Sequence, residues 1–331
     1  MSEPASESMG TAPSRMRPPS VSEAGGVSRS TAKAAARGTD AVPVRLYGLR
    51  RGTTTLLTLV SAVFAVFVLA PLVWLLIAST KTQAEIYDST GFWFAGPFRL
   101  FQNLSALGRN VSGAGVYLQW LENTLVYALL GGIGATALSA LAGYGFARFR
   151  FRGSNALFSL VMSTLLVPIS ALALPLFLVY AKVGLVNSIW GMVLPSMVSP
   201  VGIYLMRTFI DASVPADLIN AARIDGAGEL RIFCRIVLPL TVPGLVTVLL
   251  LTVVAVWNNY FLPLVLFSRG SLYPLTVGLS TLSQAAETGS QSQAVPVLVT
   301  GGLVTVLPLI LLFLLLERHF RGGALQGSVT S

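Results

Sequence analysis

Six long apolar segments, none of which contains a charged residue, constrain this chain more than any other feature of its sequence. They cover approximately residues 55–79, 123–147, 155–180, 188–206, 240–267 and 295–316. A helix rises about 1.5 Å per residue, so each segment is long enough to cross about 30 Å of hydrocarbon. Because lipid offers the backbone no hydrogen-bond partner, we expect six transmembrane helices, with kinks or broken turns at the prolines inside or beside them.

The composition agrees with an integral membrane protein and excludes several chemistries. Only 11% of the 331 residues are charged, against about 25% in soluble domains. The single cysteine, Cys234, excludes an internal disulfide and is expected to be a small packing residue. The single histidine, His319, excludes a multi-histidine metal site and a Ser/His/Asp triad. The sequence has no Gly-x-x-x-x-Gly-Lys-Ser/Thr phosphate loop, so ATP hydrolysis is not expected of this chain.

The uncharged spans also bear on the source of energy. A transporter driven by protons usually needs an ionisable group within the bilayer. The spans as bounded above hold none, which argues for an external energy source. A secondary transporter and a structural or receptor role remain the competing classes.

Lysine and arginine are distributed unevenly between the loops. Residues 1–51 are rich in Ser, Ala, Gly, Pro and Arg without apolar periodicity, which predicts a disordered basic tail, with a transit peptide as a minor alternative. If this tail is cytoplasmic, 17 of the 22 Lys and Arg residues lie on the cytoplasmic side and five lie outside. The positive-inside rule therefore predicts that both termini are cytoplasmic, including a short tail at 322–331. The net charge of +9 then follows from topology and does not indicate nucleic acid as a partner.

Two further features have competing interpretations. Span two is dense in Gly, Ala and Ser between Gly131 and Gly143, which predicts close helix packing whatever the function. The longest outer loop, about 80–122, could anchor at the membrane interface or meet an external partner through its aromatic residues Tyr87, Phe92, Trp93 and Phe94.

The segment 211–239, between spans four and five, is the one long polar interruption. Each of its charges would cost roughly 2.5 to 3.5 kcal/mol at the centre of a bilayer, so we expect it in water on the cytoplasmic side. Ser213 and Pro215 predict the start of a helix. Gly226 predicts a left-handed stop after about Ile224.

A second short helix is expected from about Ala227 to the proline that opens span five, Pro239. Its apolar face is predicted to contain Leu230, Phe233, Ile236 and Val237. The product is a helix–turn–helix elbow on the cytoplasmic surface; an ordinary amphipathic surface loop is the alternative.

The elbow resembles the signature cytoplasmic loop of ABC importer permeases. That pattern is Glu-Ala-Ala, three residues, Gly, then about nine residues to Ile-x-Leu-Pro. The chain has Asn220-Ala221-Ala222, then Asp225-Gly226, then Ile236-x-Leu238-Pro239. It departs from the pattern at Asn220, where the family usually has Glu.

Other short motifs, in order along about residues 79–327, extend the resemblance. They include Asn123-Thr124 at the start of span two, the exit of span two at 144–153, and Trp257-Asn258-Asn259 followed by Tyr-Phe-Leu-Pro in span five. Together they are similar to the carbohydrate, maltose-type branch of the family. The resemblance implies an all-α membrane protein of the type I ABC importer permease fold, with a permease domain over 52–321 that includes the coupling loop at 211–239.

The resemblance also implies a function and partners. The chain would be the permease subunit of an ATP-driven, binding-protein-dependent importer in a bacterial plasma membrane, for a sugar or oligosaccharide; glycerol-phosphate or polyamine is the alternative. Its partners would be a second permease subunit, two ATPase subunits that hold the ATP, and an external solute-binding protein. It would itself be no enzyme and would bind no cofactor.

The resemblance assigns candidate residues to two sites. The ATPase-coupling residues would be Leu218, Asn220, Ala221, Ala222, Asp225, Gly226, Phe233 and Pro239. Among these, Leu218 and Phe233 are expected to anchor in a cleft of the ATPase. Trp257, Asn258 and Asn259 could line the translocation pathway, or could serve only interhelical packing and hydrogen bonding.

Overall fold

The computed structural model describes residues 51–109, 116–288 and 293–324, with the side chains of 51–53 and 318–324 left aside. The chain divides into two units, Met1–Ala62 and Val63–Ser331. In the first unit only the beginning of α2 (Arg51–Ala78) is described, and its side chains from Thr54 on are exposed. The predicted disordered tail otherwise lies outside the described residues. Every contact reported below lies within the second unit.

The described part of the chain is helical and contains no strand. Four stretches are long and apolar enough to cross a membrane, namely Thr54–Ala78, Tyr117–Arg148, Ile189–Ser213 and Ala294–Glu317. Two bent pairs of helices bring the number up to six if each pair is one span. The predicted all-α architecture is therefore confirmed, with two spans sharply bent.

The third span is broken where the sequence predicts it. It consists of α6 (Ser154–Ser163), the short turns η1 (Thr164–Leu166) and η2 (Ile169–Leu172), and α7 (Ala173–Lys182), with a bend of 93°. Pro168 lies at the break in an extended conformation, since it lacks the N–H that a continuing helix would need.

The fourth and fifth spans are also interrupted. Ser199 separates α8 (Ile189–Ser196) from α9 (Pro200–Ser213), and its hydroxyl accepts a hydrogen bond from the Gly202 N–H at 3.0 Å. A turn at 258–260 separates α13 (Val242–Trp257) from α14 (Phe261–Leu266). By contrast α2 and α16 (Ala294–Ala324) continue through Pro71 and Pro308. α16 also runs three residues past the predicted end of the permease domain.

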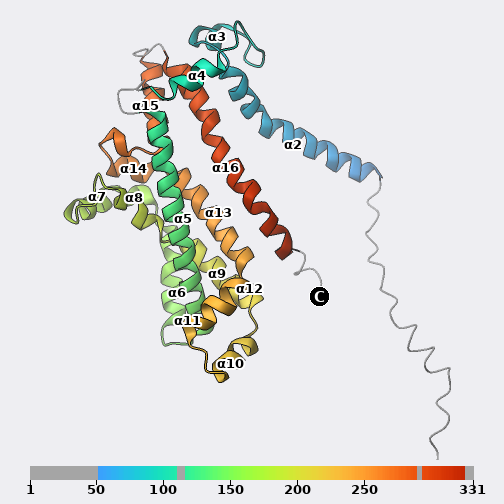
Figure 1. The fold of residues 1–331 in the computed structure, drawn as a ribbon, viewed down its shortest axis with the longest axis vertical. Coiled ribbons are helices and arrows are strands. Elements are labelled where there is room, and N and C mark those ends of the chain that lie inside the picture. The colour runs from blue at the N-terminus through green and yellow to red at the C-terminus, as the bar shows by residue number, and fades with distance from the viewer. Residues whose placement is uncertain (1–50, 110–115, 289–292, 325–331) are drawn as a thin grey trace, which may run out of the picture. The chain divides into compact units, whose positions relative to one another are not determined.

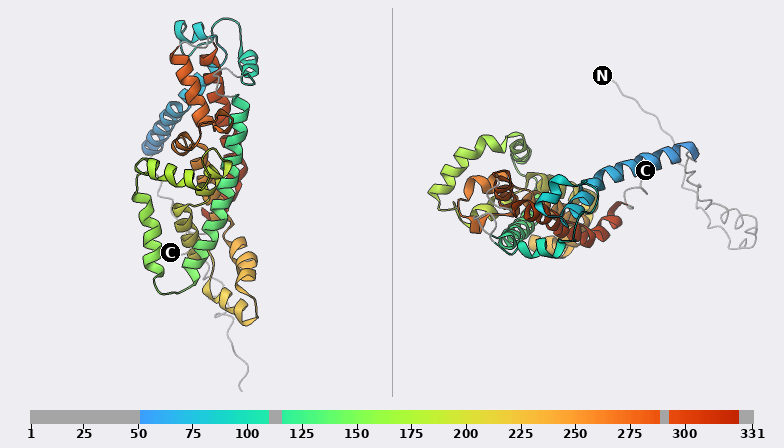
Figure 2. Two further views of the ribbon diagram at one scale, coloured as in Figure 1. Left: turned by 90° about the vertical axis from the view of Figure 1, so that its left-hand side faces the viewer. Right: turned by 90° about the horizontal axis from the view of Figure 1, so that it is seen from above.

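Helix α5 (Tyr117–Arg148) is the central element of the second unit and packs on α8, α9 and α13 (Figures 1 and 2). A Cβ atom at Gly132 would lie 2.5 Å from the Val253 side chain, and one at Gly143 would lie 2.8 Å from the Arg207 backbone nitrogen. The absence of side chains at these positions allows close approach, so the predicted packing role of the small-residue face is confirmed.

The two ends of α5 carry different structures (Figure 1). Near its N-terminus lie α3 (Gln83–Asp88), α4 (Leu100–Ala106) and α15 (Leu275–Glu287); near its C-terminus lies the polar segment with α10 (Ala216–Ile224). The sequence analysis missed α15. Its glycine at 278 packs directly on Trp120 of α5, where a Cβ would come within 2.1 Å of the ring.

The motif that opens span two holds α15 in place. The Asn123 amide donates to the carbonyls of Ser271 and Tyr273, at 2.8 and 3.0 Å. These carbonyls lie in and directly after the turn η4 (Gly270–Leu272). The Thr124 hydroxyl accepts from the Leu275 N–H at 2.8 Å. Both residues therefore have a structural role that joins the second span to the segment between spans five and six.

Candidate functional site

The polar segment folds into two short helices at a glycine turn, as predicted. α10 ends at Ile224, and Gly226 has a φ of +80°, in the left-handed region that favours glycine. The Ala227 N–H then donates to the Ala222 carbonyl at 3.0 Å, which closes the turn. α11 (Glu229–Ile232) begins two residues later than predicted because Gly228 is extended. We call residues 215–239 the elbow.

The predicted cap of the first helix is wrong. Ser213 is the last residue of α9, and Pro215 occupies the N-cap position of α10 without a side-chain cap. After α11 the chain passes through a π-helical turn, η3 (Phe233–Val237), and into α12 (Leu238–Leu240). In that wide turn the Leu238 N–H reaches the Phe233 carbonyl, directly before a proline that cannot donate. The chain then bends by 81° into α13.

The buried side of the elbow differs from the predicted apolar face. Ile232, Phe233 and Val237 are buried, whereas Leu230 is 73% exposed. Because successive residues of a helix are about 100° apart, Leu230 lies on the far side from Ile232, which the sequence pattern did not single out. The Phe233 ring lies 5.4 Å from the Tyr144 ring of α5. The expectation that Phe233 anchors in a partner is therefore wrong, since it anchors the elbow to its own chain.

A polar contact braces the elbow against α5. The Tyr144 hydroxyl donates to one carboxylate oxygen of Glu229 at 2.7 Å, and the Arg223 Nε lies 2.6 Å from the other. Arg223, and then Tyr144, hold the pKa of Glu229 below its usual range. The carboxylate thus joins both elbow helices to the end of the second span. Sequence reasoning missed this, because Tyr144 and Glu229 are 85 residues apart.

A second brace joins α5 to α9. The Arg148 guanidinium donates to the carbonyls of Ile210 and Val214, and it lies 3.5 Å from the Asp211 carboxylate. These carbonyls belong to the C-terminal end of α9, where a cation is favoured. The first brace thus connects the elbow to α5, and the second connects α5 to α9, the helix with which α5 has its most extensive contact.

We expect Tyr144→Phe to loosen the elbow. The change removes one hydrogen bond to a half-exposed carboxylate, which corresponds to about 1 kcal/mol of unfolding free energy. It should lower the melting temperature of the purified protein. Tyr204→Phe is the matched control, since the Tyr204 side chain is half exposed and its hydroxyl makes no hydrogen bond within the described residues.

The pH dependence adds a second readout. Because the folded-state pKa of Glu229 is lowered, its stabilising contribution is present above the unfolded value of about 4.3 and is lost as the pH falls through the folded value. The difference between wild type and Tyr144→Phe should therefore persist at pH 7 and shrink in acid. Equal melting of both Tyr variants and wild type at pH 7 would show that the brace is not energetically relevant.

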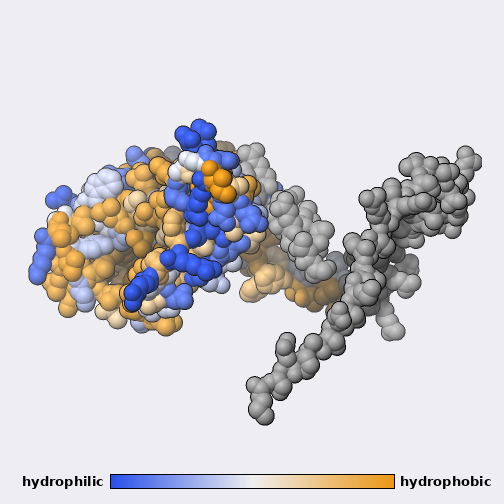
Figure 3. Space-filling model, turned by 90° about the horizontal axis from the view of Figure 1, so that it is seen from below, coloured by the Kyte–Doolittle hydropathy of each residue, from blue (hydrophilic) through white to orange (hydrophobic). Residues whose placement is uncertain are grey.

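The outer side of the elbow exposes apolar side chains to water. Ile224, next to the turn, is 87% exposed, and Leu230 and Leu218 are exposed as well. Figure 3, which views the molecule from this end, shows a central hydrophilic region that carries a small hydrophobic projection, with hydrophobic surface beside it. Among the other predicted coupling residues, Ala222 is half-buried. The remaining ones are exposed, namely Asn220, Ala221, Asp225, Gly226 and Pro239. Cys234 is exposed too, so its predicted packing role is wrong.

The three candidate pathway residues are separated by the structure. Trp257 is only 3% exposed and belongs to the core. Asn258 is exposed and donates to the Val254 carbonyl of its own helix at 2.8 Å. Asn259 accepts from the Leu262 N–H at 3.2 Å and lines a pocket of about 210 Å³. Trp257 therefore packs in the core, and Asn259 remains a candidate for the pathway.

This pocket lies where three broken spans meet. Its lining includes Ile169 beside the break in span three, Ser196 and Ser199 at the break in span four, and Asn259 at the break in span five. Thr252 contributes a further hydroxyl. Breaks in transmembrane helices are tolerated where they line a cavity, so the pocket is the best candidate in the described chain for contact with a polar solute.

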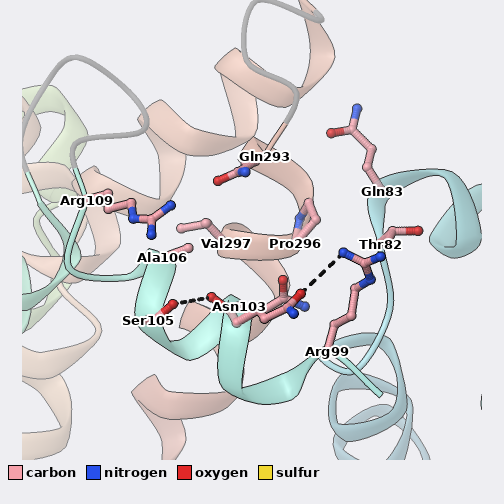
Figure 4. Close-up of a pocket in the computed structure, with 11 residues that line it drawn as sticks. Thr82, Gln83, Arg99, Asn103, Ser105, Ala106, Arg109, Gln293, Pro296 and Val297 are labelled. Carbon is pink, nitrogen blue, oxygen red and sulfur yellow. Dashed lines mark hydrogen bonds between the residues drawn. The ribbon is translucent and has the colours of Figure 1, made fainter. Parts of the chain in front are cut away.

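A second polar pocket, of about 460 Å³, lies at the opposite end from the elbow (Figure 4). Arg99 and Arg109 reach toward it from opposite sides, and its described lining contains amides but no Asp or Glu. Asn103 stabilises one wall, because its amide donates to the carbonyls of Ser79 and Lys81 at 2.8 and 3.0 Å. The described lining therefore carries two cationic groups and no acidic group.

Interrupted apolar spans and a polar helix–turn–helix elbow braced against them are the features expected of ABC importer permeases. The chain belongs to the family described as "Binding-protein-dependent transport system inner membrane component", whose model matches residues 132–323. A solved structure of a bacterial ABC transporter that imports the acidic polysaccharide alginate has the same fold, with a TM-score of 0.68 and 22% identity over 81% of this chain and 96% of that chain. The permease fold predicted from the sequence is confirmed.

Curated relatives cover most of the chain. It is 31% identical over 274 residues to the arabinooligosaccharides transport system permease protein AraQ of Bacillus subtilis (strain 168), covering 82% of this chain and 94% of the relative. It is 33% identical over 267 residues to the osmoprotective compounds uptake permease protein GgtD of Synechocystis sp., covering 79% and 87%. The sn-glycerol-3-phosphate transport system permease protein UgpE of Yersinia pestis is 29% identical, covering 83% and 96%.

Proposed function

We propose that this permease moves an uncharged, hydroxyl-rich solute, a sugar or oligosaccharide, across a bacterial plasma membrane, with both termini in the cytoplasm. The elbow is the observation that carries the proposal. It is braced to α5 on one side and presents exposed Ile224 and Leu230 on the other. Exposed apolar groups on a rigid polar surface are suited to bind a partner protein.

The energy source in this proposal is a pair of ATPase subunits in the cytoplasm. Each would accept one elbow, and a second permease subunit would complete the pathway. ATP can shift the permease only through contacts that differ between two states. Since the Glu229 brace joins the elbow to α5 and the Arg148 brace joins α5 to the end of α9, a movement of the elbow would be passed to α5 and from α5 to α9.

The lining of the pocket between the three broken spans supports a neutral solute. Its described lining contains no charged residue and offers hydroxyl and amide groups, from Ser196, Ser199, Thr252 and Asn259. One relative is named for arabinooligosaccharides, which suits such groups. Another is named for sn-glycerol-3-phosphate, so a charged solute is the alternative. Such a solute would meet no opposite charge in this pocket, so it is the weaker candidate.

An external solute-binding protein would deliver the solute at the end opposite the elbow. The pocket there supports an acidic contact surface on that partner, because Arg99 and Arg109 face it without an acid in the described lining (Figure 4).

The test is uptake of labelled oligosaccharides into proteoliposomes that contain the whole transporter. We expect uptake to need internal ATP and the binding protein, and to continue when an ionophore collapses the proton gradient. Uptake that stops with the ionophore while ATP is present would instead indicate a secondary transporter. Replacement of both Arg99 and Arg109 by Gln should reduce the stimulation of uptake by the binding protein. Arg269→Gln, which lies outside the pocket, should leave this stimulation unchanged.

A further inference from the structure

A third polar pocket, of about 460 Å³, lies at the elbow end of the molecule and has no role in the coupling described above. It is formed by the end of α5, by the loop that joins α5 to α6, by the start of α6, and by one residue of α9. In Figures 1 and 2, a loop joins α6 to α5 at this end, and α6 packs against α9. The lining consists of Phe146, Ala147, Phe149, Arg150, Phe151, Gly153, Ser154, Asn155, Ala156 and Arg207.

The pocket lies at the membrane surface. From the sequence alone, span two ends at about residue 147, span three begins at about 155, and span four ends at about 206. All three positions border this pocket. These predicted span ends support a position near the level where lipid headgroups begin.

The pocket is cationic. Arg150 and Arg207 line it, and its described lining contains no Asp or Glu. Neither arginine is paired with a carboxylate in the described part of the chain. The Arg207 guanidinium lies 4.3 Å from the centre of the Phe158 ring, which fixes its position while leaving its N–H groups available for an anion.

Apolar groups continue from the pocket along α6. Phe151, Leu157 and Leu160 are all exposed, and the two leucines lie three residues apart on one side of the helix. A ligand with an anionic head and apolar chains would match both parts of this surface, whereas a free phosphate would use only the first.

We propose that this pocket binds the phosphodiester headgroup of an anionic phospholipid of the cytoplasmic leaflet. Basic pockets between helices at that surface suit such headgroups, and each nearby Lys or Arg contributes about a fivefold gain in affinity. The guanidinium forks of Arg150 and Arg207 would hold the phosphate oxygens, and the acyl chains would lie along Leu157 and Leu160. The proposal rests on the proposed orientation only for the choice of leaflet, and not on the transported solute.

The experiment is a titration of the assembled transporter with phosphatidylglycerol and, separately, phosphatidylcholine, with the bound lipid counted by native mass spectrometry. We expect tighter binding of phosphatidylglycerol, weakened roughly tenfold or more when Arg150 and Arg207 are both replaced by Gln. Arg152→Gln is the matched control, because Arg152 is exposed two residues away but does not line the pocket. It should change the affinity less than twofold.

Three outcomes would overturn the proposal. They are equal binding of the two lipids, an Arg152→Gln effect as large as that of the double variant, and displacement of the lipid by millimolar inorganic phosphate, which would identify a site for free anions. If the double variant fails to assemble, the same titration is done with Arg150→Gln alone, since Arg150 is exposed and its replacement leaves the core intact. It should still weaken phosphatidylglycerol binding about fivefold, and unchanged binding would count against the site.

Discussion

Gly226→Pro is expected to abolish uptake while leaving the protein inserted in the membrane. Gly226 has a φ of +80°, and its N–H donates to the Arg223 carbonyl at 3.0 Å. Proline fixes φ near −65° and has no N–H, so the turn between α10 and α11 cannot form. Gly226→Ala should have a smaller effect, a strain of about 1 to 2 kcal/mol, because a Cβ there meets no atom within 4 Å.

Gly228→Ala is the matched control for this prediction. Gly228 lies in the same turn, and a Cβ there would also meet nothing within 4 Å, but its φ of −69° suits any residue. We therefore expect wild-type uptake from Gly228→Ala, measured in membrane vesicles at equal protein level. Normal uptake by Gly226→Pro, or equal losses from both changes, would show that the shape of the turn does not matter for transport.

Ile224→Asp should weaken binding of the ATPase subunits by a factor of roughly 30 or more. A fully exposed apolar side chain that becomes buried in a partner typically contributes 2 kcal/mol or more as an interface anchor, and roughly 30-fold in affinity is the equivalent. Ile224 is the most exposed large apolar residue of the elbow, and Leu230→Asp is expected to have a comparable effect. Co-purification of the ATPase with the permease measures the loss.

Cys234→Ser serves as the control on the same elbow. Cys234 is exposed, and the change is nearly isosteric, so it should leave binding intact. If Ile224→Asp retains the ATPase as well as Cys234→Ser does, the exposed side of the elbow is not the contact surface.

The sequence was informative wherever a backbone requirement or a long periodic pattern decided the structure. Gly226 and Pro168 were predicted because only a few residues fit a left-handed turn or break a helix in this way. The spans followed from length and apolar content. The coupling loop and the fold were recognisable from short motifs, since their spacing reflects the same turn and helix ends.

The remaining features depend on contacts between distant parts of the chain. Glu229 is a surface acid in the sequence and a brace only because Tyr144 lies beside it in space. Leu230 is exposed although it was expected on the apolar face, because Ile232 takes the inward position, and Phe233 is buried against its own chain at the start of the π turn. Helix α15 was missed because it is short, and the side chains that position it, such as Thr124, lie in another span.

The central claim is that the elbow is the surface through which an ATPase drives this permease. The most direct test is chemical cross-linking of Ile224→Cys, in a Cys234→Ser background, within the assembled transporter. We expect a cross-link to the ATPase whose yield changes when ATP is added, and none from Val183→Cys, which is equally suited to labelling because Val183 is 61% exposed at the end of α7. A complex that transports but gives no cross-link at position 224, or gives equal cross-links at both positions, would contradict the account.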